Sequence, residues 1–237
     1  TFAPLSNIPL KIKSLRVLIE KFIGIDSRAV FPDFSRQTFR SWFNKSEMSQ
    51  QVIGMRKVAY FHGCAANYYE PRVAQAAMEV LKRNNIKVVL PEQNCCGLPM
   101  QSNGDFESAR ALARANLKSL AEWVREGYAI VGHSTSCTLA LKHEYGSILG
   151  IDDEEAELVA KNTYDIFEYL QTLDDEGVLN TRFIQREEKV LYHAPCQQRT
   201  HGFGRPAADF MRRFGFTVTE SSADCCGVAG TYGLKSG

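Results

Sequence analysis

The sequence predicts an α/β protein in which a parallel βαβ unit is duplicated and preceded by a helical segment. Three observations carry this prediction. Short apolar strands alternate with amphipathic helices from residue 57 onward, which is typical of parallel sheets with helical crossovers. Two Cys-Cys-Gly turns, at residues 95–97 and 225–227, each follow such a strand. The strands and cysteines of the first unit return together about 130 residues later, and such a repeat indicates internal duplication.

The composition is that of a soluble globular protein with free thiols. The chain has 237 residues and a net charge of +1, so its global charge implies no nucleic-acid partner. No apolar run approaches the roughly 20 residues that span a bilayer, and no signal peptide is visible. Seven cysteines, unlike a secreted disulfide scaffold in spacing, favour a reducing, cytoplasmic location. Because the chain starts without Met and ends 11 residues after Cys226, we expect a fragment at both ends.

Residues 1–55 are expected to form a helical, basic and aromatic prelude. Apolar residues spaced as on one face of a helix predict a helix that ends at Gly24; they are Leu15, Leu18, Ile19, Phe22 and Ile23. Residues 1–50 hold eight Lys or Arg against four Asp or Glu. Such a segment can pack on a neighbouring domain, or it can meet an anionic membrane or a membrane partner. The sequence leaves both interpretations open.

The first βαβ unit, which we call the first CCG unit, is assigned to residues 56–150. Strands are expected at residues 57–61, 86–90 and 128–131, with helices from residue 71 and over residues 105–126. Ligands of parallel sheets bind beyond the carboxyl ends of the strands. We therefore expect the cysteines that follow the three strands to converge there; they are Cys64, Cys95, Cys96 and Cys137.

Residues 151–188 are expected to connect the two units as an acidic helix and a linker. Residues 152–176 hold ten Asp or Glu against one Lys. Leu158, Val159, Ile166 and Leu170 still make an apolar stripe, so we predict one solvated connecting helix. Residues 171–187 are predicted to be the linker.

The second CCG unit, residues 189–237, matches the first in register. The strand at residues 189–192 corresponds to residues 57–60, and a helix is expected at residues 206–214. The separation is 132 positions between Cys64 and Cys196, and 130 between Cys95 and Cys225. We expect this unit to be cut short, so that Cys196, Cys225 and Cys226 form an incomplete metal site.

The cysteine pattern favours metal binding over disulfides. Neighbouring cysteines cannot form an unstrained disulfide with each other, whereas two thiolates on one turn can bind metal. Four thiolates can hold zinc or an iron–sulfur cluster. Zinc sites usually use Cys-x-x-Cys pairs, and adjacent cysteines suit a cluster in which each sulfur binds a different iron. Gly97 has no Cβ, so the backbone can approach that cluster closely.

Polar residues beside the cysteines are candidates for tuning the cluster. His62 lies two residues before Cys64, and His193 three before Cys196. Each could donate a hydrogen bond to a cluster sulfur or, alternatively, to the loop backbone. His133 and Ser134, which precede Cys137, are candidates for an additional ligand. The sequence contains no nucleotide-binding glycine motif and no hydrolytic triad, so we expect no catalytic residue.

At these residues the chain resembles a known family. The motifs are Phe-His-Gly-Cys at 61–64, Asn-Cys-Cys-Gly-Leu-Pro at 94–99, Tyr-His-Ala-Pro-Cys at 192–196 and the segment 225–233. They are similar to the cysteine-rich CCG domains of heterodisulfide reductases and of iron–sulfur subunits of respiratory dehydrogenases. The likeness is greatest to subunits that serve anaerobic glycerol 3-phosphate oxidation, and it covers nearly the whole chain.

The resemblance implies an electron-transfer subunit with a 4Fe-4S type cluster. It also implies flavoprotein partner subunits that bind the organic substrate, and a place on the inner face of the cell membrane from which electrons pass to quinone. Related subunits serve lactate and glycolate oxidation, and heterodisulfide reductases cleave a disulfide. A zinc-stabilised binding module is the alternative without redox chemistry.

The chain departs from the family pattern of Cys, Cys-Cys-Gly and Cys-x-x-Cys. Ser134 stands at the first position of the expected Cys-x-x-Cys pair, so the first CCG unit has four cysteines instead of five. Cubane and non-cubane clusters both stay open. The closing pair of the second unit would lie beyond Gly237, and we expect a second cluster only in a longer chain. The ferredoxin-like segment that precedes the family's first domain is also missing from this sequence.

Overall fold

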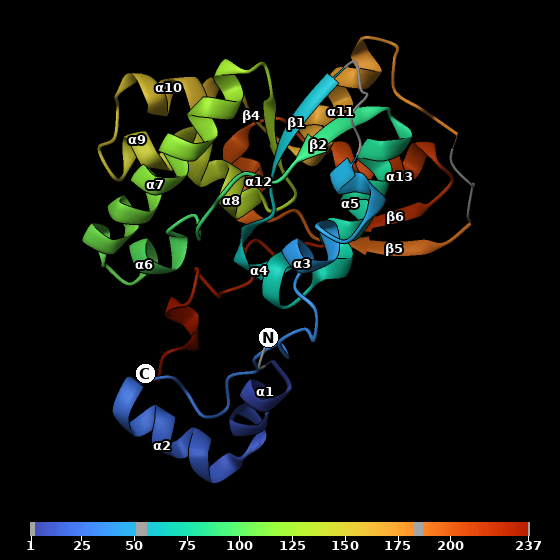
Figure 1. Ribbon diagram of the computed structural model, residues 1–237. Coiled ribbons are helices and arrows are strands. Elements are labelled where there is room, and N and C mark those ends of the chain that lie inside the picture. The colour runs from blue at the N-terminus through green and yellow to red at the C-terminus, as the bar shows by residue number, and fades with distance from the viewer. Residues whose placement is uncertain (1–2, 51–55, 183–186, 237) are drawn as a thin grey trace.

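The expected α/β class with parallel strands is confirmed. The computed structural model describes residues 3–50, 56–182 and 187–236. Its main sheet is parallel, with the strand order β2-β1-β3-β4 (Figure 1). The strands are β1 (Arg56–Phe61), β2 (Ile86–Val89), β3 (Ala129–Gly132) and β4 (Thr163–Asp165). A second parallel sheet pairs β5 (Lys189–Tyr192) with β6 (Thr217–Glu220).

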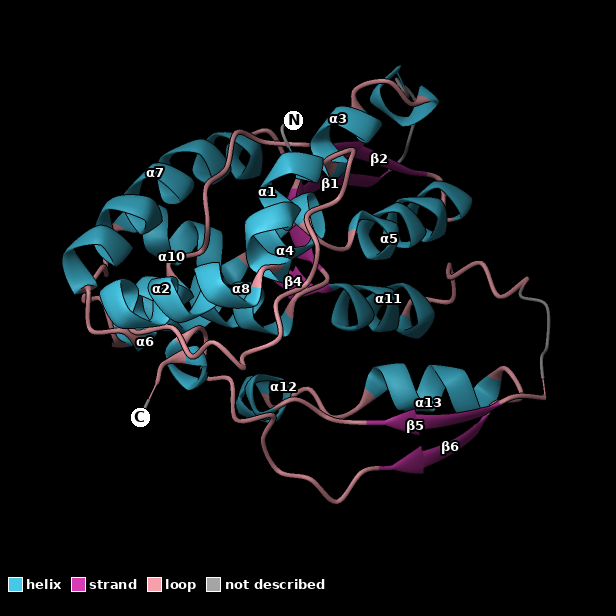
Figure 2. Cartoon of the chain, turned by 90° about the horizontal axis from the view of Figure 1, so that it is seen from below, coloured by secondary structure: helices cyan, strands magenta, loops and turns pink. Residues whose placement is uncertain are grey.

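Helices cover both faces of the main sheet (Figure 2). On one face lie α7 (Phe106–Arg125) and α10 (Glu154–Lys161), and on the other lie α5 (Pro71–Arg83) and α11 (Ile166–Asp175). In β1, Ala59 and Phe61 pack in the apolar cluster with α7, whereas Val58 and Tyr60 pack in the cluster with α5. Burial on both faces explains why this strand has a continuous apolar sequence.

Short helices follow the strands of the main sheet at their carboxyl ends. They are α4 (Gly63–Tyr68) after β1, α6 (Leu98–Ser102) after the first Cys-Cys-Gly turn, and α8 (Thr135–Leu139) after β3. A π-helical turn, η2 (Ala140–Glu144), and α9 (Tyr145–Ser147) continue α8. The helix predicted over residues 105–126 is confirmed as α7, with the Asp105 side chain accepting from the Ser108 N–H at its start.

The predicted duplication of the βαβ unit is confirmed in the strand register. Elements β5, α12 (Cys196–His201), α13 (Pro206–Arg213) and β6 repeat the order β1, α4, α5 and β2. Val58 pairs with Val88 in the main sheet, and Val190 pairs with Val218 in the second. Both α5 and α13 begin with Pro, which suits the first helical position.

The prediction of one solvated helix over residues 152–176 is wrong. The segment forms α10, then β4, then α11, and β4 joins the main sheet beside β3. The predicted linker also begins too early, because α11 extends to Asp175 and buries Tyr169, Leu170 and Leu173. The acidic composition reflects helix starts: the side chains of Asp153 and Asp165 accept backbone N–H groups at the first turns of α10 and α11.

The prelude is helical, as predicted. It contains α1 (Ala3–Lys11), α2 (Lys13–Ile23), α3 (Phe39–Phe43) and the 3-10 turn η1 (Glu47–Gln50). Helix α2 ends at Gly24 in a left-handed conformation with φ 75°. The tail that carries the 3-10 turn η3 (Tyr232–Leu234) returns to this point, where the Asp26 N–H donates to the Leu234 carbonyl at 2.9 Å.

The expected boundary between the prelude and the first CCG unit, near residue 55, lies outside the described residues, as do residues 183–186 of the expected linker. Within the described ranges, no helix combines the length and the apolar character that crossing a bilayer requires.

Candidate metal centre

The cysteines of the first CCG unit lie together at the carboxyl edge of the main sheet. Cys64 is in α4 after β1, Cys95 and Cys96 follow β2, and Cys137 is in α8 after β3. β1 lies between β2 and β3, so the three segments start side by side. The Sγ atoms of Cys64 and Cys95 are 4.0 Å apart, and the thiols of Cys96 and Cys137 interact with each other.

Gly63 allows these segments to approach closely. Its φ of +66° is in the left-handed region, and a Cβ at this position would lie 3.0 Å from the Cys137 Sγ. A side chain here would therefore meet sulfur directly. Gly97, after the cysteine pair, has a φ of +90°, and a Cβ there would meet the Ala109 carbonyl oxygen of α7 at 3.3 Å. Both glycines are thus required by the backbone and by close packing.

The thiol environment favours at least one thiolate. Hydrogen bonds from the thiols of Cys64 and Cys96, and from the Gly97 and Cys96 N–H groups, lower the pKa of Cys95 to about 3. The interaction with Cys95 and burial raise the pKa of Cys64. The pKa of Cys137 is lowered by its contacts with Cys96 and with the hydroxyl of Ser134. Thiolate is the form that binds soft metals and iron–sulfur clusters.

The donor set fits a thiolate-bound metal or cluster, although the thiols are arranged as contacting pairs. In the part of the chain that the structure describes, no group of three or more Cys, His, Asp or Glu side chains is already arranged around a metal position. Cys96 and Cys137 are buried, whereas Cys64 and Cys95 are half-buried. The site therefore has a closed inner side and a more open outer side.

Asn116 holds the first Cys-Cys-Gly turn in place, and sequence reasoning missed it. This fully buried residue of α7 accepts from the Asn94 N–H at 2.7 Å through Oδ1. Its Nδ2 donates to the Cys95 carbonyl at 3.0 Å and lies 3.2 Å from the Tyr145 hydroxyl. The signal in the sequence was a single Asn within the apolar face of the helix predicted at residues 105–126. A buried amide that bonds both an N–H and a carbonyl group holds the backbone at Asn94 and Cys95 in position.

Gln93 holds the first cysteine loop in the same way. Its Oε1 accepts from the His62 N–H at 2.9 Å, and its Nε2 donates to the Tyr60 carbonyl at 3.1 Å. A residue just before the Cys-Cys-Gly turn thus ties that turn to the end of β1. No pattern in the sequence indicated this role.

The two histidines of the first CCG unit lie in an aromatic cluster formed by Phe39, Tyr60, His62 and His133. The His62 ring packs edge-on against Phe39 at 5.6 Å, and its Nδ1 is 2.7 Å from the Gly63 carbonyl. His133 Nδ1 is 2.8 Å from the Tyr60 hydroxyl. Burial lowers the pKa of each histidine to about 4. The bond from His62 to its own loop backbone is the alternative that the sequence left open.

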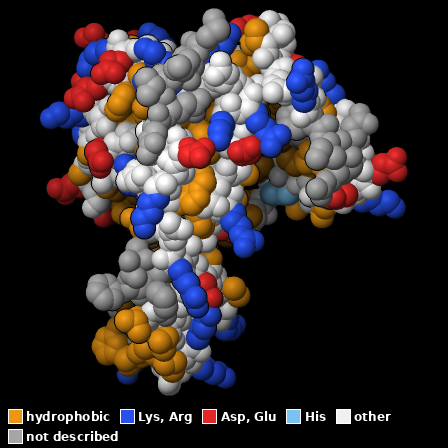
Figure 3. Space-filling model, turned by 45° about the vertical axis from the view of Figure 1, so that its right-hand side comes forward, with side chains coloured by type: hydrophobic (Ala, Val, Ile, Leu, Met, Phe, Trp, Pro, Cys, Tyr) orange, Lys and Arg blue, Asp and Glu red, His pale blue; other side chains and the backbone are white. Residues whose placement is uncertain are grey.

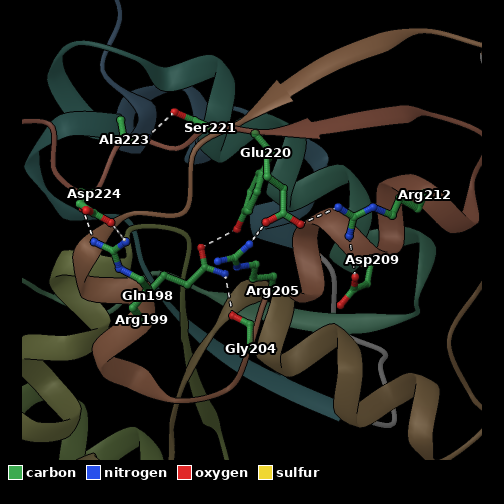
Figure 4. A network of polar contacts seen from close by, with 11 residues as sticks. Gln198, Arg199, Gly204, Arg205, Asp209, Arg212, Glu220, Ser221, Ala223 and Asp224 are labelled. Atoms are coloured by element: carbon green, nitrogen blue, oxygen red, sulfur yellow. Dashed lines mark hydrogen bonds and ion pairs between the residues drawn. The ribbon is translucent and has the colours of Figure 1, made fainter.

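The cysteines of the second CCG unit are more exposed. Cys196 is half-buried, and Cys225 and Cys226 are exposed. Arg199 of α12 forms an ion pair with Asp224 at 3.0 Å and also donates to its backbone carbonyl, which holds the second Cys-Cys-Gly turn beside α12 (Figure 4). Gln198 accepts from the Tyr192 hydroxyl at 2.5 Å. In the same view it donates to the Gly204 carbonyl at 3.1 Å. His193 is half-buried between β5 and α12.

The two units contact each other beside their cysteines. The Ser136 hydroxyl donates to the Gln197 side chain at 2.7 Å, and these residues are the direct neighbours of Cys137 and Cys196. His201 of α12 lies 3.2 Å from the Thr138 hydroxyl of α8. Asn103 donates to Thr231 at 2.6 Å, so the segment after the second turn reaches the helix after the first. The helices of the two cysteine sites therefore pack directly on one another.

The fold and the site define a class: an α/β protein with a duplicated βαβ unit whose parallel strands deliver clustered thiols to one sheet edge. Comparison with known proteins finds a similar family within the chain. The family model described as a cysteine-rich domain, CCG, matches residues 58–142.

Curated relatives extend the similarity beyond that domain. The chain is 33% identical over 241 aligned positions to a subunit of the anaerobic glycerol-3-phosphate dehydrogenase of Escherichia coli (strain K12), covering 99% of this chain and 59% of the relative. It is 28% identical to the glycolate oxidase iron-sulfur subunit of the same strain, over 90% of this chain and 53% of the relative. It is 26% identical to lactate utilization protein A 2 of Bacillus cereus (strain AH820), over 76% of this chain and 74% of the relative. The chain thus spans little more than half the length of the first two relatives.

Proposed function

We propose that this chain is an iron–sulfur electron-transfer subunit of a respiratory dehydrogenase. The observation that carries the proposal is the convergence of Cys64, Cys95, Cys96 and Cys137 at one sheet edge, in a unit that the chain repeats. Buried thiolates suit iron–sulfur clusters, which transfer single electrons at potentials set by ligands, hydrogen bonds and exposure. The relative named as an iron-sulfur subunit supports the same assignment.

In this proposal the first CCG unit holds a cluster of the 4Fe-4S type. Cys64, Cys95, Cys96 and Cys137 would be its ligands, while Ser134 and the half-buried His133 stay candidates beside it. Cys196, Cys225 and Cys226 would belong to a second site, in the second CCG unit. When bound, the cluster would supply one-electron chemistry. This chain's own residues would fix its position: Gly63 leaves the space, and Asn116 and Gln93 hold the loops.

The most similar of the relatives described above favours glycerol 3-phosphate as the ultimate electron donor. The substrate would be oxidised at a flavoprotein partner subunit, and this chain would pass the electrons towards membrane quinone. The glycolate oxidase relative supports a second candidate, the same electron-transfer role with a hydroxy-acid substrate. Co-purification of the flavoprotein partners, followed by an assay with each substrate, distinguishes the two.

A place at the inner face of the cell membrane is supported by the prelude helices. Helices α1 and α2 project away from the sheet, and hydrophobic side chains gather at their end (Figures 1 and 3). Phe22 and Ile23 of α2 are 76% and 67% exposed, and Lys11, Lys13 and Lys21 are nearby in sequence. An amphipathic, basic helix of this kind suits the surface of an anionic bilayer or a membrane partner.

The experiment that tests the proposed function is metal analysis of the anaerobically purified chain, combined with visible and paramagnetic resonance spectra. Iron and acid-labile sulfide, with broad visible absorbance that dithionite bleaches, would support the proposal. One zinc per chain without iron would instead indicate a zinc-stabilised binding module. Turnover of a disulfide by the loaded chain would favour the reductase alternative over electron transfer.

A further inference from the structure

A large apolar cavity lies on the face of the main sheet that α5 and α11 cover. Its volume is about 730 Å³, and α13 of the second CCG unit closes its third side. All residues that line it are apolar except Arg72 and His133; they include Val73, Ala76, Ile166, Leu170, Phe210 and Phe214. The volume is within the range of about 300–1,000 Å³ that is typical of small-molecule sites. The lining excludes a sugar or a nucleotide, because it offers too few polar partners.

Aromatic rings make one wall of the cavity. The Phe210 and Phe214 rings are stacked at 6.4 Å with an angle of 4° between their planes, and Phe167 lies 6.4 Å from Phe210. All three residues line the cavity. A wall of stacked rings favours a flat, conjugated ligand over a flexible aliphatic chain, because ring pairs contribute beyond their buried area.

One polar group stands at the sheet end of the cavity. His133 lines it, and the Nδ1 of this residue is already bonded to the buried Tyr60 hydroxyl at 2.8 Å. The ring nitrogen left for a ligand is Nε2. An imidazole nitrogen beside a tyrosine suits a carbonyl or hydroxyl group on an otherwise apolar ligand, because it can donate or accept a hydrogen bond.

This end of the cavity is next to the thiol site in the chain. His133 lies between β3 and α8, the helix that contains Cys137, and Tyr60 lies at the end of β1, just before the Cys64 loop. The cavity therefore reaches the end of β3 at His133, and the Tyr60 hydroxyl connects this residue to the end of β1. A redox ligand in the cavity would lie on the far side of these same two loops.

We infer that this cavity binds the ring of a quinone, with the aromatic wall along the ring face and the His133 Nε2 at a ring oxygen. The inference rests on the proposed function, because a quinone is the electron acceptor that this function requires. It assigns the acceptor to this chain, on residues from both CCG units.

The test is titration calorimetry of the anaerobically purified, oxidised chain with duroquinone, a fully substituted quinone that does not add to thiols. Ala76→Trp fills the cavity from an exposed position of α5 and is expected to weaken binding at least tenfold. His133→Leu removes the polar partner and is also expected to weaken binding about tenfold. Ala111→Trp, at an exposed position of α7 outside the cavity, is the matched control and should bind as the unmodified chain does.

If the Ala76→Trp and Ala111→Trp variants bound duroquinone equally well, the inference would be overturned. It would also be overturned if the chain bound decanoate, a flexible aliphatic chain, but not duroquinone. Iron is measured on the same samples, so the two hypotheses can fail separately. Duroquinone binding without iron would keep the quinone site and contradict the electron-transfer proposal. Iron without duroquinone binding would support the electron-transfer proposal and contradict the quinone site.

Discussion

The Asn116 side chain donates a hydrogen bond to the Cys95 carbonyl oxygen at 3.0 Å from a fully buried position on α7. The same amide accepts from the Asn94 N–H, so one residue of a long helix fixes the backbone at the start of the first Cys-Cys-Gly turn. The position of the thiols is thus set by the helix that crosses the sheet, as well as by the loops that carry them.

Replacing Asn116 should loosen this turn. Asn116→Leu keeps a similar branched shape but removes the partner of the Asn94 N–H and of the Cys95 carbonyl, and we expect it to lower the free energy of unfolding by about 2–3 kcal/mol. Asn116→Asp keeps the bond from the Asn94 N–H and should be less damaging to the turn geometry. Urea denaturation measures the stability, and iron per chain measures the site.

Lys118→Leu introduces the same side chain at an exposed position of the same helix and is the control. Lys118→Leu should change neither the free energy of unfolding nor the iron content. If Asn116→Leu retained the iron content and the spectrum of the unmodified chain, Asn116 would have no role in positioning Cys95.

Gly63→Ala should damage the thiol site beyond its effect on the backbone. A left-handed φ costs a non-glycine residue about 1–2 kcal/mol, and the new Cβ would also meet the Cys137 Sγ at 3.0 Å. Gly127→Ala is the matched control, because Gly127 has a φ of +84° and a Cβ there would have nothing within 4 Å. Gly63→Ala should lose at least as much stability as Gly127→Ala in thermal unfolding, and only Gly63→Ala should lose iron. Equal iron in the two variants would mean that the sulfur contact is unimportant.

Asp165 should make stability depend on pH. Burial raises the pKa of this carboxyl from 3.8 to about 7, against the lowering effect of hydrogen bonds from the Phe167 N–H and of Lys142. The folded state therefore holds a proton between these pH values that the unfolded state has released. Its contribution to stability is present below about pH 4 and is lost as pH rises to about 7, at roughly 1.4 kcal/mol per pH unit at most.

Asp165→Asn keeps a cap for α11 and removes this titration. We expect the variant to gain stability relative to the unmodified chain as the pH increases from 5 to 8, as measured by urea denaturation at each pH. The comparison between variants cancels the opposite contribution of His62 and His133, whose lowered pKa values favour folding at higher pH. A constant difference across this range would show that Asp165 titrates normally.

The prelude should bind anionic vesicles through α2. Phe22→Glu combined with Ile23→Glu places charge on its exposed apolar face, and co-sedimentation with phosphatidylglycerol vesicles should fall at least tenfold. Val30→Glu is the control, because Val30 is 87% exposed but outside the helix. Unchanged co-sedimentation of the double variant would leave packing on another domain as the role of this segment.

The sequence predicted most of the strands, the main helices and the duplication because each has a local signature. Alternation of apolar strands and helices located β1, β2 and β3, and the repeated cysteines located the second CCG unit. It did not predict β4, since three residues between two acidic helices carry no strand pattern, and their place in the sheet depends on pairing with β3. The acidic residues of this segment led to the wrong prediction of one solvated helix, because Asp153 and Asp165 begin helices instead of lying on a solvated surface.

The cysteines of the candidate site could be chosen from the sequence, but the residues that hold their loops in position could not. Asn116 and Gln93 act through hydrogen bonds to backbone groups far along the chain. Such bonds follow no fixed spacing in the sequence. The histidines were chosen for their distance from cysteines in sequence. Their rings instead lie with Phe39 and Tyr60, because His62 directly follows β1 and continues the alternation that places Val58 and Tyr60 on the α5 face.

The central claim, that the first CCG unit binds an iron–sulfur cluster, is tested most directly by iron and sulfide content in matched cysteine variants. We predict that Cys96→Ala, in the buried pair, loses the iron and the dithionite-bleachable absorbance of the unmodified chain. Cys226→Ala, at the corresponding exposed position of the second unit, should retain both. Iron that is retained in Cys96→Ala, or zinc in place of iron in the unmodified chain, would contradict the account.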